Sequence, residues 1–150
     1  MRLYSAVGPS ASGTANKTAV TVIGSTAIRP AVCDVTVGMI TAPNATDFQI
    51  GWAVGRFTAA GTAGSSYTPL ASDTGEVAAT CTSGITHSGE PTYTAGGTAL
   101  SVYMNQRATY RWVAQDGREI YGTAGANNGV GTYLVAATSC QIQATVFWKE

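Results

Sequence analysis

The sequence predicts an all-β protein that folds as a single-domain antiparallel β-sandwich, jelly-roll-like, of about eight strands. Apolar and polar residues alternate with a period of two in several segments, and no segment keeps the 3.6-residue apolar period of a helix. Turn-forming residues separate these segments. A chain of 150 residues has the length of one domain, so we expect residues 1–150 to form a single unit.

The N-terminal part is expected to hold four strands. The chain enters the first almost at once, and the alternation then predicts strands at residues 19–23, 32–40 and 47–58. The segment 47–58 is the clearest, because its bulky apolar residues, Trp52 among them, fall on one face.

Residues 59–98 have a different composition. They are rich in Gly, Ser and Thr and carry few bulky side chains, which is typical of a long loop region. Because a structureless loop of this length is uncommon in a compact domain, we expect one or two short strands within it, near residues 67–70 and 76–82.

Alternation returns in the C-terminal part, where it predicts strands at residues 100–105, 110–113, 132–135 and 141–148. Asp116-Gly117 lies between residues 110–113 and 118–121 and is typical of a tight hairpin. A first strand near the start of the chain and a last strand near its end favour the jelly-roll arrangement, in which the end strands lie together.

The composition argues against catalysis. Half of the residues are Ala, Gly, Thr or Ser, and only 11% are charged. Active sites need titratable side chains with shifted pKa values, or metal ligands, and this chain has few of either. We therefore predict a structural or binding protein rather than an enzyme, with no cofactor and no metal site. The formal net charge of +0 leaves no basic excess to neutralise phosphates, so nucleic acid is not an expected partner.

The apolar segments are short. None is long enough for the core of a signal peptide or for a membrane span, so we expect synthesis in a cytoplasm and no membrane partner. Cys33, Cys81 and Cys140 are far apart in the sequence and lack the spacing of a zinc or redox motif. We expect them to be buried or half-buried thiols.

His87 is the one histidine, and with Glu90 it would be the best material for an active site. No second histidine or cysteine pair accompanies it, so we expect His87 on a surface loop. The glycine-rich segment 122–129 lacks the lysine and the following helix of a phosphate-binding loop, and is expected to be a plain loop.

Two pairs of acids resemble the carboxylate pairs of glycosidases. These are Asp73 with Glu76, and Asp116 with Glu119. Both pairs lie beside glycine in predicted turns, where Asp is a common turn-forming residue. We therefore expect all four carboxylates to be exposed to solvent and to have no catalytic role.

Arg107, Tyr110, Arg111 and Trp112 form the densest group of residues that commonly anchor protein–protein contacts. Trp148, near the end of the last predicted strand, is a fifth candidate for an interface. In the alternative interpretation, Tyr110 and Trp112 share one strand face and fill the core while Arg111 points to solvent. Trp148 is likewise either a core residue or a contact residue.

Several motifs together resemble a known group of proteins. They are the start Met1-Arg2-Leu3-Tyr4-Ser5 with the early strand pair, the segment from Ser65 to Leu70 leading into Asp73-Thr74-Gly75-Glu76, the Trp112-centred segment 110–120, the segment 124–131, and the end Val146-Phe147-Trp148-Lys149-Glu150. Their order resembles that in small virion proteins of tailed bacteriophages, capsid decoration (cement) proteins among them.

The resemblance implies a β-sandwich or jelly-roll unit that binds the outer surface of an assembled phage head at capsomer junctions and stabilises it. The major capsid protein would be its partner, and it would form a homo-oligomer, a trimer in preference to a dimer. Its place would be the capsid surface of the virion, after synthesis in the host cytoplasm without a signal peptide. The motifs carry no catalytic residues.

Two other functions stay open. One is a tail, fibre or baseplate component of the same kind of virus. The other is a carbohydrate-binding jelly-roll module, in which Tyr93, Tyr103, Asn105 and Tyr133 would supply the aromatic and amide groups that contact a sugar.

Overall fold

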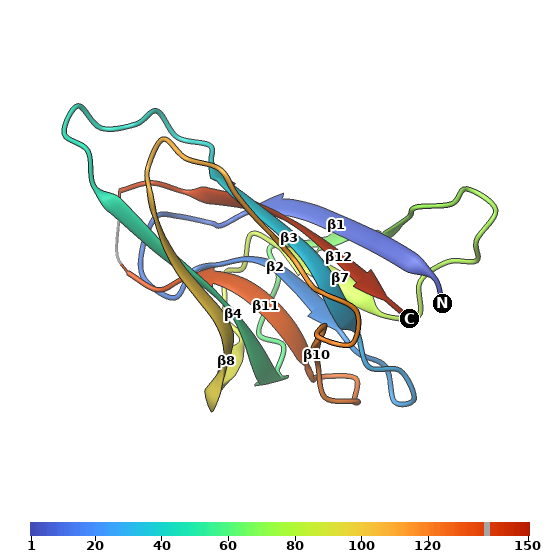
Figure 1. Ribbon diagram of the computed structural model, residues 1–150. Helices are drawn as coiled ribbons and strands as arrows, with labels where there is room; N and C mark the ends of the chain where they lie inside the picture. The colour runs from blue at the N-terminus through green and yellow to red at the C-terminus, as the bar shows by residue number, and fades with distance from the viewer. Residues whose placement is uncertain (137–138) are drawn as a thin grey trace.

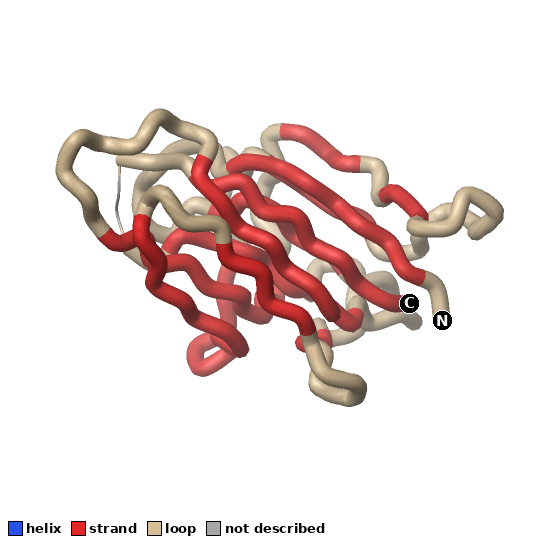
Figure 2. Tube along the Cα trace, turned by 45° about the horizontal axis from the view of Figure 1, so that its top comes forward, coloured by secondary structure: helices blue, strands red, loops and turns tan. Residues whose placement is uncertain are grey.

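The computed structural model describes residues 1–136 and 139–150, and these residues form twelve strands and no helix (Figures 1 and 2). The strands make two six-stranded antiparallel sheets that pack together as a β-sandwich. The predicted all-β sandwich is therefore confirmed, while the number of strands exceeds the expected eight or so. In the described part of the chain, no helix is long and apolar enough to cross a membrane.

One sheet, called sheet A here, contains both end strands of the chain. Its members are β1 (Leu3–Pro9), β3 (Ala31–Met39), β6 (Leu70–Ala71), β9 (Tyr110–Val113), β10 (Ile120–Tyr121) and β12 (Ile142–Lys149). The strand order is β10-β3-β12-β1-β6, and β9 also pairs with β3. Because β1 pairs with β12 along its whole length, the two ends of the chain lie side by side (Figure 1).

The other sheet, sheet B, has a long strand at one edge. Its members are β2 (Thr18–Ile23), β4 (Gln49–Ala59), β5 (Ser65–Tyr67), β7 (Thr82–Ile85), β8 (Thr92–Asn105) and β11 (Gly129–Leu134). The order is β5-β7-β2-β11-β4-β8, so β8 forms an edge and is bonded to β4 alone among the described strands.

The core lies between the two sheets and contains most of the large apolar side chains. Trp52 on β4 and Trp148 on β12 are fully buried, and the Trp148 ring lies 6.1 Å from that of Tyr4 on β1. Burying a side chain of this size contributes about 1.5–3 kcal/mol. Trp148, which the sequence left as either core or contact, is therefore a core residue.

Strand β4 is buried on both faces, which strict alternation does not predict. On its outer side the ring of Tyr103 lies over Gly51, where an added Cβ would stand 2.6 Å from the ring. The rings of Tyr93 and Tyr133 cover Gly55 in the same way. Glycine thus lets aromatic rings lie flat against this sheet.

The predicted hairpin between residues 110–113 and 118–121 is wrong. Both segments pair with β3, β9 opposite residues 34–37 and β10 opposite residues 31–32. The chain runs on along one edge of β3, and the Asp116-Gly117 turn, with Gly117 at a φ of 79°, makes a protrusion rather than a reversal. Asp-Gly makes the turn here, but β3 offers an edge long enough to pair with both residues 110–113 and residues 120–121.

The long loop region supplies edge strands to both sheets. Strand β6 extends sheet A beside β1, while β7 and β5 extend sheet B beside β2. A strand expected at residues 76–82 begins only at Thr82, and residues 92–98, expected as loop, belong to β8. Residues 72–81 connect β6 to β7. The Glu150 carboxylate holds the last part of this connection by accepting hydrogen bonds of 2.9 Å from the backbone N–H groups of Thr80 and Cys81.

Candidate interaction surface

Strand β9 presents different residues to the two sides of sheet A. The Tyr110 ring meets the core residue Trp52 edge-on at 5.9 Å, and Trp112 packs against the core. Side chains alternate along a strand, so Arg111 and Val113 point outward. Val113 is a large apolar side chain with 56% of its surface exposed.

Arg111 and Val113 border a shallow hollow on the outer face of sheet A, here named the Arg111 hollow. Four strands or their ends supply its lining: Leu3, Cys33, Asp34, Arg111, Val113, Ala114, Phe147 and Lys149. The apolar members come from β1, β9 and β12 and from the residue after β9. An apolar patch rimmed by charged side chains is the usual composition of a protein–protein contact.

The charges at the Arg111 hollow are paired within the chain. The Arg111 Nε donates to both Asp34 oxygens, at 3.1 and 3.0 Å, and these hydrogen bonds raise the pKa of the guanidinium above its usual value. Lys149 Nζ lies 2.7 Å from Glu119 Oε1, and this hydrogen bond lowers the pKa of the Glu119 carboxyl. The rim therefore carries no net charge, and a partner meets no isolated ion.

Cys33 also lines the Arg111 hollow. Its side chain is half-buried, and burial raises the pKa of the thiol above its ordinary value. A protonated thiol is a weak nucleophile and a poor metal ligand. Cys81 and Cys140 are buried, so all three cysteines have the burial expected from the sequence.

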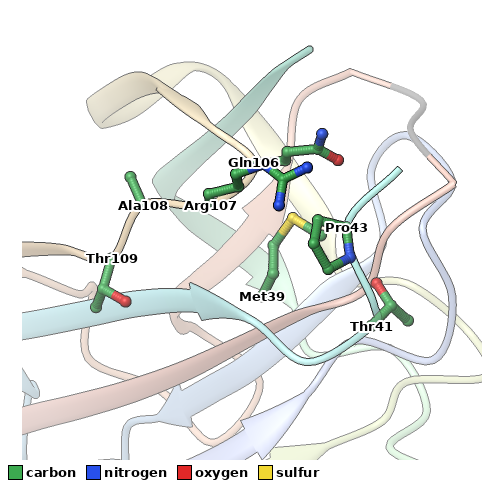
Figure 3. Close-up of a pocket in the computed structure, with 7 residues that line it drawn as sticks. All are labelled: Met39, Thr41, Pro43, Gln106, Arg107, Ala108 and Thr109. Carbon is green, nitrogen blue, oxygen red and sulfur yellow. The ribbon is translucent and has the colours of Figure 1, made fainter. Parts of the chain in front are cut away.

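Arg107 belongs to a second, separate pocket at the end of the sandwich (Figure 3). The residues that line it are Met39, Thr41, Pro43, Gln106, Arg107, Ala108 and Thr109. Gln106 is 2% exposed, and its amide nitrogen donates to the carbonyls of Asn44 and Thr46 and to the Asp47 carboxylate. Arg107 Nε also contacts Asp47, at 2.8 Å. These bonds hold the loop of residues 40–48 against the turn after β8.

The five interface candidates therefore occupy different places. Arg107 lies in the end pocket, Arg111 on the outer face of sheet A, Tyr110 and Trp112 toward the core, and Trp148 inside it. Tyr110 keeps 39% of its surface exposed and Trp112 is half-buried.

Sequence reasoning missed several residues of the Arg111 hollow. Period-two alternation does place Val113 on the same face as Arg111, and Phe147 on the face opposite Trp148. The contribution of Asp34 had no sequence signal, because it depends on the pairing of β9 with β3.

His87 is fully buried, so the expectation of a surface loop is wrong. Its Nε2 lies 3.3 Å from Thr21 Oγ1 on the outer side of sheet B, while Nδ1 has no partner among the described residues. Burial lowers the pKa of the ring below its usual value. Glu90 accepts a hydrogen bond from the Thr18 N–H at 2.7 Å and pairs with Lys17 at 3.0 Å.

Three of the four turn acids are exposed as expected, namely Asp73, Glu76 and Asp116. Glu119 differs, since its side chain is only 6% exposed and pairs with Lys149. Across residues 1–136 and 139–150, no group of three or more His, Cys, Asp or Glu side chains is placed to hold a metal ion.

The residues considered for sugar binding do not form one exposed site. The rings of Tyr93 and Tyr133 lie 4.0 Å apart, and Tyr133 is only 9% exposed. Tyr103 is 58% exposed, and Asn105 uses its side-chain oxygen to accept the Arg107 N–H. The stacked tyrosines are therefore engaged in covering sheet B.

No family model, curated protein or solved structure matches this chain.

Proposed function

We propose that this chain is a non-enzymatic virion protein of a tailed bacteriophage, a decoration protein that binds the outer surface of the assembled head and stabilises it. The major capsid protein is the proposed partner, and the contact is at capsomer junctions. The observation that carries this proposal is the Arg111 hollow, an apolar surface with internally paired charges on the outer face of sheet A. The order of the sequence motifs supports the class of protein.

We also propose that the sandwich is a jelly roll with an insertion. Without the short strands β5, β6 and β7, sheet A has the order β1-β12-β3 followed by β9 and β10, and sheet B has the order β2-β11-β4-β8. Successive strands mostly alternate between the sheets, and the first and last strands are neighbours. These features support two interlocked Greek keys, with residues 60–91 as an insertion.

Stabilisation follows from mass action. A protein that binds the assembled shell but not its free subunits shifts the equilibrium toward the shell. Docking through the Arg111 hollow removes Leu3, Val113 and Phe147 from water, at about 25 cal/mol for each Å² of apolar surface buried. Because Arg111 and Lys149 keep their carboxylate partners, no unpaired charge is buried.

Val113→Lys tests this contact, with Val77→Lys as the matched control. Both valines are exposed to a similar degree, 56% and 55%, but Val77 lies on the loop after β6 and is not among the residues that line the hollow. A lysine at position 113 places a charge in the apolar contact, so binding to empty heads should weaken at least about tenfold, while Val77→Lys binds like the parent. Co-sedimentation with heads measures both. Equal binding by the two variants would exclude the hollow from the contact.

A further inference from the structure

Strand β8 is an unusually long unprotected sheet edge. It has 14 residues, whereas the strands at the other sheet edges have two to four. In the described part of the chain, β8 is bonded to β4 alone, so half of its backbone N–H and C=O groups face outward. Such an edge is a template for another strand.

The composition of β8 leaves this edge open. Residues 92–105 contain no Lys, Arg, Asp, Glu or Pro, the residues that normally protect edges. The first half of β8 is irregular, with three shifts of register against β4. Residues 100–105, in contrast, pair with residues 49–54 without interruption. The regular half is therefore the part that offers an ordered row of backbone groups.

We propose that this edge pairs antiparallel with the same edge of a second copy, centred on Val102. Leu100 then lies opposite Met104 of the second copy, and Ser101 opposite its Tyr103. Directly opposite residues share a face, so the inward set meets the inward set and the outward set meets the outward set. Leu100 and Val102, half-buried and packed on the core, gain cover from their counterparts.

The absence of charge in β8 makes a second copy a partner without like-charge repulsion. In a two-fold pairing, β8 of one copy lies beside β8 of the other, so the side chains of this strand face one another. Like charges opposite each other destabilise a sheet. An uncharged strand pairs with itself at no such cost. The pairing is two-fold, so it makes a dimer rather than the trimer expected from the sequence, and it joins the two B sheets across the dimer axis.

This inference goes beyond the proposed function and does not depend on it. The dimer carries two Arg111 hollows, each on the outer face of its own sheet A. If the hollows bind a capsid, two sites on one unit raise the effective affinity without a new contact.

Two double variants at positions 101 and 103 test the pairing and its register, because position 101 of each copy lies opposite position 103 of the other. Ser101→Lys with Tyr103→Lys therefore places lysine opposite lysine in both of these cross-copy pairs. Ser101→Glu with Tyr103→Lys changes the same positions but places glutamate opposite lysine. Both variants lose the Tyr103 ring from Gly51, so this cost to folding is the same in both. Sedimentation equilibrium of the purified protein measures the association.

The parent should be a dimer, the Glu/Lys variant should remain one, and the Lys/Lys variant should associate at least about tenfold more weakly. A parent that stays monomeric at millimolar concentration overturns the proposal. So does an equal association of the two variants, or a trimer whose mass is the same in all three proteins. None of these results tests whether the Arg111 hollow is the capsid contact, which Val113→Lys tests separately.

Discussion

At the scale of single residues, His87 connects the insertion to the sandwich. It lies in the insertion of residues 60–91, and its ring reaches Thr21 on β2. Ala63 and Gly84 are close by, since a Cβ on Gly84 would stand 2.7 Å from that of Ala63 and 3.4 Å from His87 Nε2. A neutral imidazole fits this buried position, and a charged one does not.

His87 should therefore make stability depend on pH. Burial lowers its pKa below the ordinary value of 6.5, with Glu90 opposing the shift and Lys17 adding to it. As the pH falls below 6.5, the imidazole of the unfolded chain takes up a proton while that of the folded chain stays neutral. The free energy of unfolding therefore decreases, by at most about 1.4 kcal/mol per pH unit. Above that pH the contribution is fully present.

His87→Gln removes this proton and keeps a polar side chain. Urea unfolding of the parent and of the variant near pH 7.5 and near pH 5.5 measures the effect, with the variant less dependent on pH over this range. The same pH dependence in both proteins would show that His87 does not titrate on unfolding.

At the scale of elements, the outer face of sheet B depends on pairs of glycine and tyrosine. A Cβ on Gly131 of β11 would stand 2.4 Å from the Tyr93 hydroxyl oxygen. That hydroxyl is also 2.8 Å from Thr18 Oγ1 on β2, and the Phe57 ring packs edge-on against Tyr93. The contacts of Tyr93 therefore link its own strand, β8, to β4, β11 and β2.

Gly131→Ala should displace Tyr93 and destabilise the fold by about 1–3 kcal/mol, because the ring must move and the bond to Thr18 is lost. Gly75→Ala is the control, since a Cβ there meets only Asp73 Oδ1, at an ordinary 3.5 Å. Thermal unfolding followed by circular dichroism compares the two. Equal melting temperatures would contradict the packing described for Tyr93.

The elements also show how far sequence reasoning reaches. Alternation located most strands, because one face of each is buried; β12 follows this rule along its length. It did not predict pairing, so β9 and β10 were expected to pair with each other rather than with β3. It also missed the burial of His87, which arises from the way residues 59–66 fold over sheet B.

The candidate surface was predictable only in part. Arg111 was singled out from composition, and alternation gives Val113 beside it. The ion pair with Asp34 and the contribution of Phe147 depend on which strands are neighbours, and that information is not local in the sequence. Tryptophan is a common interface residue, but Trp148 is buried because its side of β12 faces the core.

At the scale of the whole molecule, the sandwich offers two distinct surfaces. The Arg111 hollow lies on the outer face of sheet A, and the open edge of β8 lies on sheet B. In the proposed arrangement the first contacts the capsid and the second joins two copies. A dimer of this kind would bind neighbouring capsomers through its two Arg111 hollows.

The central claim is that this chain decorates a phage head. Quantitative mass spectrometry of gradient-purified particles that encode it, with the major capsid protein as the internal reference, tests the claim most directly. The account predicts hundreds of copies per particle in a fixed ratio to the capsid protein. A few copies, or a few dozen, would contradict it and assign the chain to the tail, fibre or baseplate, and complete absence from particles would exclude a virion role.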